Sequence, residues 1–407
     1  MSNVQLITDN GQLSVGWEIK SLNDLCENLD SKRIPITKSF RDLGDIPYYG
    51  ASGIVDYIAD YIFDEDLLLV SEDGANLLAR TYPIAFSITG KTWVNNHAHV
   101  LRFNQIITQR FVEYYLNSIS LQPYVSGMAQ PKLNQKALNS IPIPMPPIAE
   151  QKRIVAILDE AFEGCDRAIR NTEKNLANAR ELFESYLNAI FTKKGDGWEN
   201  KKLEDICSIK HGFAFKGEFF TNEPSDYILL TPGSFYESGG YREQGGKTKY
   251  YVGEIPYSYI LKKGDFLFAM TEQAVGLLGS SLIVPESDRF LHNQRLGLMQ
   301  VFDGFEYYND FFFYQFNTQR FRDAVQSTAS GVKVRHTSPK KLGAITVFFP
   351  PTIAAQKVIA DTLNDLYSEI QNLETIYRQK LAALKELKQS ILQKAFTGEL
   401  TADKEVA

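Results

Sequence analysis

The 407-residue sequence predicts an α+β protein in which two β-rich globular units alternate with two long helices. Two observations predict this: a motif that occurs twice, and a change from strand signals to helical periodicity at each copy. Residues 146–155 read PPIAEQKRIV and residues 350–359 read PPTIAAQKVI, and each stretch opens a long run rich in Leu, Ile, Ala, Lys and Glu. Such a repeat indicates a duplicated structural module.

The repeat extends well beyond this motif. GWEIKSLNDLC, starting at Gly16, matches GWENKKLEDIC, starting at Gly197, and LLLVSEDGAN resembles FLFAMTEQAV. Downstream, SGMAQPKLNQKALNSIPIPMPP aligns with SGVKVRHTSPKKLGAITVFFPP. The expected order is a globular unit, a long helix, a second unit, a second helix and a short tail, over residues 1–147, 148–194, 195–351, 352–400 and 401–407.

Strand signals dominate the segments before each helix. Aromatic and β-branched runs such as YILL (227–230), KYYV (249–252) and DFLFAM (265–270) are separated by clusters of Gly, Pro, Asn and Asp. Each unit ends in a proline-rich exit, IPIPMPP or VFFPP. Proline ends strand pairing there and prepares the chain to enter a helix.

The long helices are predicted from apolar residues that recur every three or four positions on one face. Each helix therefore needs a partner, and the simplest partner is the other helix, in an antiparallel coiled coil with a pseudo-two-fold axis. Two separate helical bundles remain the alternative. The residues expected in the pairing seam are Ile154, Leu158, Ala161, Cys165, Leu176, Leu182, Ile190, Ile359, Leu363, Leu366, Ile370, Leu381, Leu387 and Ile391.

Bulk composition excludes several classes of protein. No stretch approaches 18 consecutive apolar residues, and the polar opening MSNVQLITDN lacks the pattern of a secretion signal, so a cytoplasmic protein with no membrane role is expected. Three scattered cysteines support neither a disulfide framework nor a cysteine zinc site. A net charge of −6 argues against a protein that coats DNA nonspecifically.

No catalytic motif is recognisable. A methyltransferase would need a glycine-rich cofactor loop and an (Asn/Asp)-Pro-Pro-aromatic motif, but the double prolines follow Met145 and Phe349. TGKT (89–92) lacks the first glycine of a phosphate loop, because that position is Ala85. The chain is therefore expected to have no catalytic residue and no cofactor of its own.

A histidine pair and a set of acidic residues are candidates for a metal site and for catalytic acids. His97 and His99 could offer two metal ligands from one strand face, but no third ligand stands at a recognisable spacing, so no metal site is expected. Glu72, Asp73 and Glu272 could form a repeated catalytic acid, although such acids more often end a strand or cap a turn.

Each globular unit contains clusters of side chains suited to nucleic acid. Asn, Gln and Arg match the donor and acceptor pairs of base edges, and Lys contacts phosphates. The same residue types also occur on solvated faces and turns. The candidate DNA-binding residues are Lys32, Arg33, Lys38, Arg41, Tyr48, Tyr49, Arg80, Lys91, Asn95, Asn96, His97, His211, Lys216, Arg242, Lys247, Lys249, Gln273, His292, Asn293, Gln294, Arg295, Lys333 and Arg335.

Local charge limits how these clusters can act. Residues 1–147 hold 11 Lys and Arg against 15 Asp and Glu, and residues 197–351 hold 17 of each. Neither unit is net basic. If the units bind DNA, a partner protein is expected to neutralise much of the phosphate charge.

The chain as a whole resembles the specificity subunit of type I restriction-modification systems. The resemblance is carried by IPYYGASG (46–53), WVNNHAHVLRF (93–103), GMAQPKLNQKAL (127–138) and PPIAEQKRIVAILD, together with the duplication. It departs from that pattern in the second copy, which has Ala355 where the first has Glu150.

The resemblance implies a non-catalytic subunit with two target-recognition domains, each binding one half of a split double-stranded DNA sequence. It also implies that the paired helices set the spacing and dock two DNA methyltransferase (modification) subunits, which methylate adenine N6. S-adenosylmethionine would then belong to those subunits, and ATP and Mg to added restriction subunits. The alternatives are a helical scaffold whose units bind proteins or glycans, and an enzyme with a disguised active site.

Overall fold

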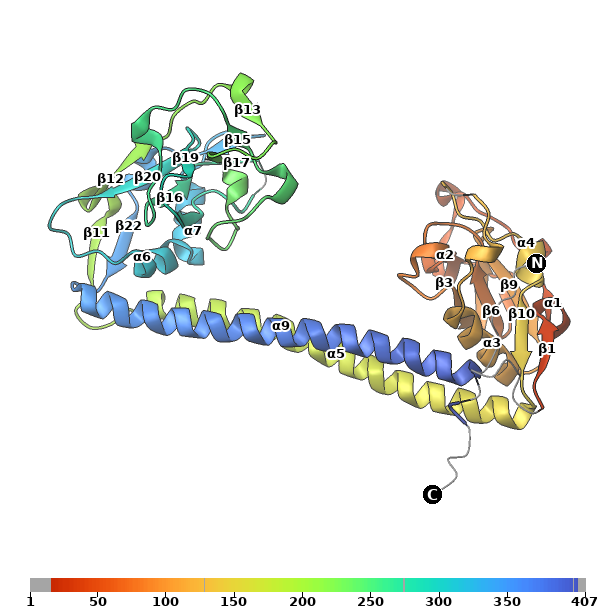
Figure 1. Cartoon of the computed structure of the whole chain (residues 1–407). Helices are drawn as coiled ribbons and strands as arrows, with labels where there is room; N and C mark the ends of the chain where they lie inside the picture. The colour runs from red at the N-terminus through yellow and green to blue at the C-terminus, as the bar shows by residue number, and fades with distance from the viewer. Residues whose placement is uncertain (1–15, 128, 274, 398, 402–407) are drawn as a thin grey trace. The chain divides into compact units, whose positions relative to one another are not determined.

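A computed structural model describes residues 16–127, 129–273, 275–397 and 399–401 (Figure 1). Residues 1–15 and 402–407, which belong to the expected first unit and tail, lie outside the described residues. The chain divides into two compact units: unit 1 is Met1–Glu173 with Arg378–Ala407, and unit 2 is Lys174–Tyr377. Each unit therefore contains part of both long helices.

Unit 1 contains two four-stranded sheets, with strand orders β2-β9-β6-β7 and β4-β3-β8-β5, and a two-stranded ladder, β1-β10. Its strands are β1 Glu18–Ser21, β2 Cys26–Asn28, β3 Leu43–Gly50, β4 Gly53–Ile58, β5 Phe63–Asp64, β6 Leu67–Ser71, β7 Ala85–Ile88, β8 Lys91–Val94, β9 Ala98–Phe103 and β10 Pro142–Met145. Its helices are α1 Leu22–Leu25, α2 Asn76–Ala79, α3 Ile106–Ser118, α4 Gln135–Asn139 and the first part of α5 Ile148–Lys193.

Unit 2 repeats this plan with the sheets β12-β20-β16-β18 and β13-β15-β14-β19 and the ladder β11-β22. Its strands are β11 Glu199–Lys202, β12 Cys207–His211, β13 Phe220–Thr221, β14 Ile228–Leu230, β15 Tyr250–Tyr251, β16 Phe266–Ala269, β17 Thr271–Glu272, β18 Ser281–Ile283, β19 Phe290–His292, β20 Leu296–Val301, β21 Arg335–His336 and β22 Thr346–Phe349. Its helices are α6 Asn309–Phe316, α7 Gln319–Ser327, α8 Pro339–Gly343 and the first part of α9 Ile353–Thr397.

The two units agree in strand pairing as well as in order. The parallel pair β3–β8 in unit 1 corresponds to the parallel pair β14–β19 in unit 2. The central strands β6 and β16 are buried along their whole length, which explains why both read as continuous apolar runs. The expected α+β fold with an internal repeat is confirmed.

Small matching details show how closely the copies correspond. The thiol of Cys26 donates to the carbonyl of Leu22, and the thiol of Cys207 donates to Leu203, both at 3.3 Å. Burial raises the pKa of both thiols to about 12. These two cysteines are packing residues, because a thiol with such a pKa carries almost no thiolate at neutral pH.

The segment before each helical exit also repeats. Gly127 and Gly331 both have positive φ, and a Cβ at either would lie 2.6 or 2.1 Å from a carbonyl oxygen across the same short hairpin. Asn134 and Ser338 then cap α4 and α8 by accepting from backbone N–H groups. Residues 126–127 and 129–134 are therefore structurally equivalent to residues 330–331 and 333–338.

In each unit, a buried glutamine of the long helix forms a hydrogen bond with the proline-rich exit. The side-chain Nε2 of Gln151 donates to the carbonyl of Pro146 at 2.8 Å, and that of Gln356 donates to Pro350 at 3.0 Å and Glu306 at 2.9 Å. Gln356 Oε1 also accepts from the N–H of Tyr308 at 2.9 Å. This is the structural reason for the glutamine in both copies of the PPIAEQ-type motif.

Replacing Gln356 with alanine is expected to destabilise unit 2 by roughly 2–3 kcal/mol, because three backbone groups lose their partner in the interior. Thermal unfolding of the full-length chain would measure the loss as a lower Tm. Lys357→Ala is the matched control, since Lys357 is exposed on the next position of the helix. Equal Tm values for the two variants would show that the glutamine is dispensable.

The long helices pair in antiparallel fashion within each unit. In unit 1, Lys388 Nζ of α9 contacts Asp166 Oδ1 of α5 at 2.7 Å. In unit 2, Arg180 Nε contacts Glu374 Oε1 at 2.8 Å. Each unit therefore contains an antiparallel pair of α5 and α9 segments joined by an ion pair.

The predicted seam is correct in part. Most of its residues are buried or half-buried, but Leu182 and Leu387 are 59% and 48% exposed. The prediction used steps of three and four, whereas the inward face of this part of α5 advances by fours, from Ala179 to Phe183, Leu187 and Phe191. Because an α-helix has about 3.6 residues per turn, the step of three from Ala179 to Leu182 turns the side chain to the other side of the contact face from Phe183.

Polar residues replace the missing leucines in the seam of α9. Glu374 is only 5% exposed, whereas its neighbour Leu373 is 39% exposed. Likewise, Lys388 is half-buried and its neighbour Leu387 is exposed. The ends of the helices join the globular cores: Ile154 and Leu158 with Leu392 in unit 1, and Leu187 with Leu363 in unit 2. Within the described ranges, none of the helices combines the length and apolar character needed to cross a bilayer.

Candidate nucleic-acid interface

Three segments meet where the central strand of each unit ends. In unit 1, the N–H of Glu72 donates to the carbonyl of His97 at 2.9 Å, and the N–H of Leu133 donates to Glu72 at 2.8 Å. In unit 2, the N–H of Met270 donates to Arg295 at 2.9 Å, and that of Thr337 donates to Met270 at 3.0 Å. The same backbone junction therefore occurs twice.

We call these surfaces the loop edges. The loop edge of unit 1 comprises residues 72–73, 95–97, 126–127 and 129–133, and that of unit 2 comprises residues 270–273, 293–295 and 330–337. In unit 2, β17 lies within the loop edge, and β19 directly precedes residues 293–295. Both strands lie on the side away from α9, whereas β11 and β22 lie next to it (Figure 1).

A sharp turn in each loop edge is held by one buried asparagine. Asn95 Oδ1 accepts from the N–H of His97 at 2.8 Å, and Asn293 Oδ1 accepts from the N–H of Arg295 at 3.0 Å. Both asparagines are nearly buried, at 7% and 5% exposure. The turn directs the next two side chains into solvent: Asn96 and His97 in unit 1, and Gln294 and Arg295 in unit 2.

Several predicted DNA contacts are corrected by burial. Asn95 and Asn293 use their side-chain oxygens to hold these turns. Tyr48 is 1% exposed, and its hydroxyl accepts from the N–H of Ile36 at 3.0 Å. His292 is fully buried against the carbonyl of Leu296, and burial lowers its pKa to about 4, so it is neutral at neutral pH. All four residues are therefore buried or nearly buried.

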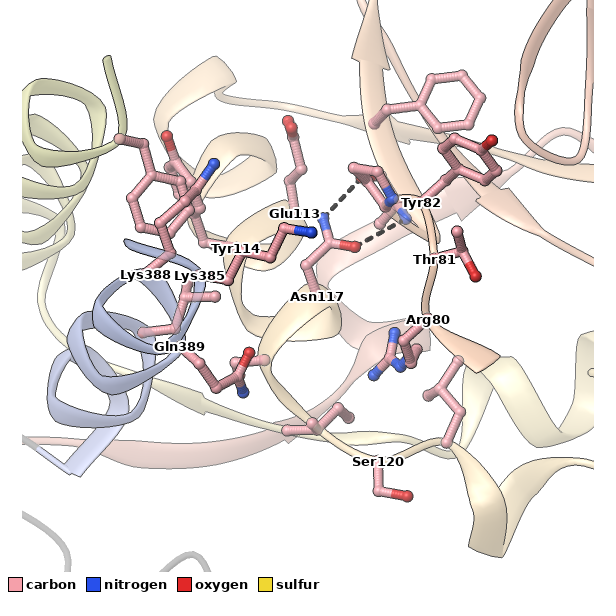
Figure 2. Close-up of a pocket in the computed structure, with 18 of the residues that line it drawn as sticks. Arg80, Thr81, Tyr82, Glu113, Tyr114, Asn117, Ser120, Lys385, Lys388 and Gln389 are labelled. Carbon is pink, nitrogen blue, oxygen red and sulfur yellow. Dashed lines mark hydrogen bonds between the residues drawn. The ribbon is translucent and has the colours of Figure 1, made fainter. Parts of the chain in front are cut away.

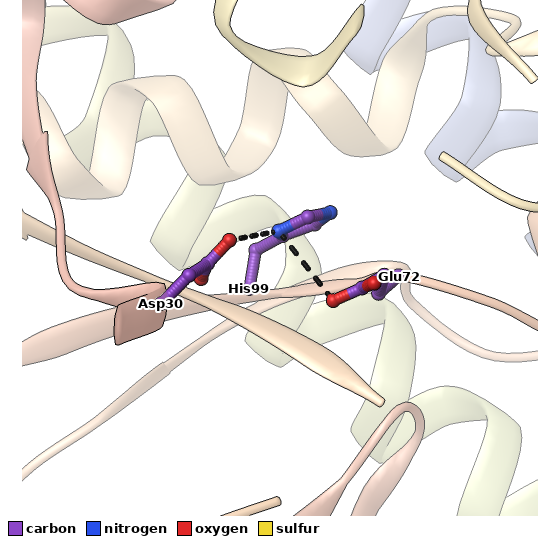
Figure 3. A group of neighbouring side chains, drawn as sticks. All are labelled: Asp30, Glu72 and His99. Atoms are coloured by element: carbon purple, nitrogen blue, oxygen red, sulfur yellow. Dashed lines mark hydrogen bonds and ion pairs between the residues drawn. The ribbon is translucent and has the colours of Figure 1, made fainter. Parts of the chain in front are cut away.

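Arg33 belongs to a buried charge cluster behind the loop edge of unit 1. Its Nη1 contacts Glu72 Oε2 at 2.6 Å, and its Nη2 lies 3.5 Å from Asp30 Oδ2. The same Asp30 oxygen lies 2.6 Å from His99 Nδ1 (Figure 3). The Arg33 side chain is only 12% exposed, so the prediction that it contacts DNA is replaced by an internal role.

The cluster holds its acids in the charged form. Burial alone raises the pKa of Asp30, but the hydrogen bond and charge of His99, with the charge of Arg33, leave it below its ordinary value. Burial likewise raises the pKa of Glu72, and Arg33 and His99 outweigh that effect and lower it. Both carboxylates are therefore ionised and paired at neutral pH.

Asp30, Glu72 and His99 could in principle approach one metal ion, since their ligand atoms lie within 4.8 Å of one another. The neighbouring side chains argue against that use. His99 Nδ1 faces a carboxylate and its Nε2 meets the carbonyl of Leu133 at 2.8 Å, so both ring nitrogens serve as donors. The guanidinium of Arg33 already supplies the positive charge that a metal would bring.

Unit 2 uses a different charge pair at its loop edge. Glu272 is 2% exposed, and its Oε2 accepts from the N–H groups of Gly276 and Leu278 at 3.1 and 2.8 Å. Its Oε1 lies 3.2 Å from Nη1 of Arg335. Glu72 and Glu272 are thus structural acids that order loops, and Arg335 is engaged internally as well.

A pocket in unit 1 contains Arg80, which the sequence predicted to be a DNA contact. It has a volume of about 1040 Å³ and lies among α3, α5, α9 and the segment after α2 (Figure 2). Arg80 lines it, and its guanidinium nitrogens lie 3.4 Å from the carbonyl of Leu116. Burial lowers the pKa of Arg80, and burial raises that of Glu113 on the same wall. Arg80 therefore belongs to this pocket.

The remaining predicted residues divide into two groups. Some are on or beside a loop edge: Asn96, His97, Gln273, Gln294, Arg295 and Lys333 lie within the defined segments, and His211 pairs with Gly297 on the adjoining strand. The others lie on other loops and strands: Lys32, Lys38, Arg41, Tyr49, Lys91, Lys216, Arg242, Lys247 and Lys249. Arg41 is already paired with Asp56 at 2.8 Å.

The loop edges also contain exposed polar residues that the sequence reasoning missed. Gln130 and Lys132 lie on the hairpin of unit 1, and His336 lies on that of unit 2. Lys132 Nζ contacts Glu72 Oε1 at 3.2 Å. The alignment of the two hairpin segments contained the signal, because it places these residues beside Lys333 and Arg335.

Comparisons with known proteins agree with this duplicated plan. Residues 14–178 and 195–381 match the family described as type I restriction modification DNA specificity domain. A Haemophilus influenzae relative of this class is 38% identical over 142 residues, 35% of this chain and 36% of the relative. The EcoBI specificity subunit of Escherichia coli is 28% identical over 228 residues, 56% of this chain and 44% of its own length. The chain thus spans less than half the length of these curated relatives.

Other matches cover nearly the whole chain. The MjaVIII specificity subunit of Methanocaldococcus jannaschii is 22% identical over 94% of this chain and 93% of its own length. A solved chain from a type I restriction-modification system has a TM-score of 0.71, at 18% identity over 96% of this chain and 100% of that chain. The HsdS subunit of Thermoanaerobacter tengcongensis has a TM-score of 0.57, at 18% identity over 96% and 98%.

These solved structures share the fold, and the family match confirms the resemblance inferred from the motifs. The two matched segments also cover both copies of the internal repeat and most of the sequence. The chain therefore belongs to the type I restriction-modification DNA specificity family.

Proposed function

We propose that this chain is the non-catalytic subunit that selects the DNA sequence in a type I restriction-modification complex. Each unit binds one half of a bipartite double-stranded target through its loop edge. The observation that carries the proposal is the repeated turn, in which an asparagine side chain accepts from the same backbone N–H in both units but the exposed side chains differ. Two turns with the same backbone conformation but different exposed side chains are suited to binding two half-sites of different sequence.

Charge supports a role within a complex. Neither globular segment is net basic, and ion pairs with Glu72 and Glu272 already engage Arg33 and Arg335. Binding to DNA by these units alone would neutralise few phosphates, and affinity depends strongly on that neutralisation. Partner subunits are therefore proposed to supply most of the phosphate contacts.

The outward faces of the helices support docking of two modification subunits. In unit 2, Leu182 and Tyr186 on α5 and Leu373 and Ile376 on α9 are between 39% and 59% exposed, although the helices are paired. In unit 1, Leu387 is 48% exposed. Apolar side chains that remain exposed on a paired helix indicate a further protein surface. S-adenosylmethionine is proposed to bind to the modification subunits, and ATP and Mg to restriction subunits where these join.

Methylome sequencing of cells that express this chain together with its modification subunit tests the proposal. The expected result is N6-methyladenine on both strands of a split, non-palindromic motif, which disappears when this chain is left out. Methylation of the same motif without this chain would contradict the proposal. Absence of any motif from cells in which the complex assembles would favour a scaffold that binds other molecules.

A further inference from the structure

The two loop edges differ at one structurally equivalent position. The carbonyl of His97 accepts from Glu72, and the carbonyl of Arg295 accepts from Met270 at the matching point of unit 2. The N–H groups of His97 and Arg295 are likewise both bound by the asparagine two residues earlier. The backbone therefore places His97 and Arg295 in the same way within their units.

The side chains at this position have different hydrogen-bonding freedom. Among the described residues, no ion pair or hydrogen bond engages the guanidinium of Arg295, and the residue is exposed. By contrast, His97 Nδ1 lies 2.9 Å from Asp73 Oδ2. A carboxylate only accepts, so Nδ1 carries the hydrogen and only Nε2 is left to meet a ligand.

We infer that Arg295 reads a guanine in the half-site bound by unit 2, and that His97 makes no equivalent contact in unit 1. A guanidinium offers two parallel N–H donors that match the O6 and N7 acceptors of guanine in the major groove. The one free nitrogen of His97 cannot form such a pair, and the carboxylate of Asp73 beside it repels those acceptors. The inference rests on the proposed function and names one of its specificity-determining residues.

Arg295 has one main competing role, contact with a phosphate. A phosphate contact carries no sequence information, so its loss weakens binding to all duplexes by a similar factor. Loss of a guanine contact instead removes discrimination at one base pair. The Arg295→Ala variant therefore distinguishes the two roles.

The experiment uses the complete complex with its modification subunits. Once the wild-type motif is known, binding is measured to duplexes in which each G·C pair of both half-sites is replaced in turn by A·T. The wild type is expected to lose about 10- to 100-fold in affinity at the guanine read by Arg295. Arg295→Ala is expected to bind that one substituted duplex as well as the original, and to keep discrimination at all other positions.

Two control variants complete the design. Lys201→Ala removes an exposed positive charge from β11, the strand that pairs with the exit to α9, and should leave all discrimination intact. His97→Ala should leave the guanine assigned to Arg295 unaffected. Full discrimination by Arg295→Ala, or a motif without guanine in either half-site, would overturn the inference. A wild-type complex with no motif would instead refute the proposed function itself.

Discussion

Replacing Arg33 with alanine is expected to lower the free energy of unfolding of unit 1 by about 3–5 kcal/mol at neutral pH. The guanidinium lies against Glu72 and Asp30, whose side chains are only 12% and 7% exposed. Removing the guanidinium leaves the carboxylates of Glu72 and Asp30 in the interior without the positive charge of Arg33. Thermal unfolding of the full-length chain measures the effect, and Lys32→Ala is the control because Lys32 is exposed at the preceding position.

The pH dependence gives an independent check on this prediction. In the wild type, the pKa values of Asp30 and Glu72 lie below their ordinary values, so the stability from these groups is present above about pH 5 and is lost as pH falls through the folded pKa values. Without Arg33 both pKa values rise, and protonation relieves the buried charge earlier. The difference in Tm between wild type and Arg33→Ala should narrow from pH 7 towards pH 4. A constant difference would mean that packing, not charge, explains the loss.

Shortening both long helices by one heptad is expected to abolish methylation of the wild-type motif and to shorten the gap in any motif that replaces it. Removing 168–174 from α5 and 380–386 from α9 keeps Asp166 opposite Lys388 and Arg180 opposite Glu374. Seven residues shorten a helix by about 10 Å, which corresponds to about three base pairs at 3.4 Å each. Methylome sequencing of cells with the modification subunit reads the result.

A mismatched deletion is the control for the helix experiment. Removing 168–174 alone shifts α5 against α9, so the pair Arg180 and Glu374 and the pair Asp166 and Lys388 cannot both form. This variant is expected to lose assembly and methylation altogether. A double deletion that still methylates the original spacing would contradict the expectation, implied by the family resemblance, that the paired helices set the gap between half-sites.

The sequence predicted the outcome best where the signal was local and repeated. The run of strands, the two proline exits and the phase of α5 near Ile154 and Leu158 all follow from patterns within a few residues of each other. The predicted seam failed at Leu182 and Leu387, because their half-buried neighbours Phe183 and Lys388 occupy the inward positions. Sequence spacing alone did not reveal that Glu374 and Lys388 take the places of leucines.

The candidate site was predicted less well, since residue type does not determine whether a polar side chain is exposed. Asn95, Asn96 and His97 are consecutive and look alike as DNA contacts, yet Asn95 is buried and the other two are exposed. The difference arises because Asn95 caps its own turn. The same reasoning separates Asn293 from Gln294 and Arg295.

The sequence by itself determined the duplicated α+β plan, the two long helices and the family, because repeats and helical periodicity can be recognised from consecutive residues. Only the tertiary structure decided which charges are internal and which are presented. Asp30, Glu72 and His99 are far apart in the chain, and they become one buried cluster only when β6 and β9 pair in register. Burial of a charge depends on such distant partners, so no local pattern could have distinguished the engaged Arg33 from the exposed Arg295.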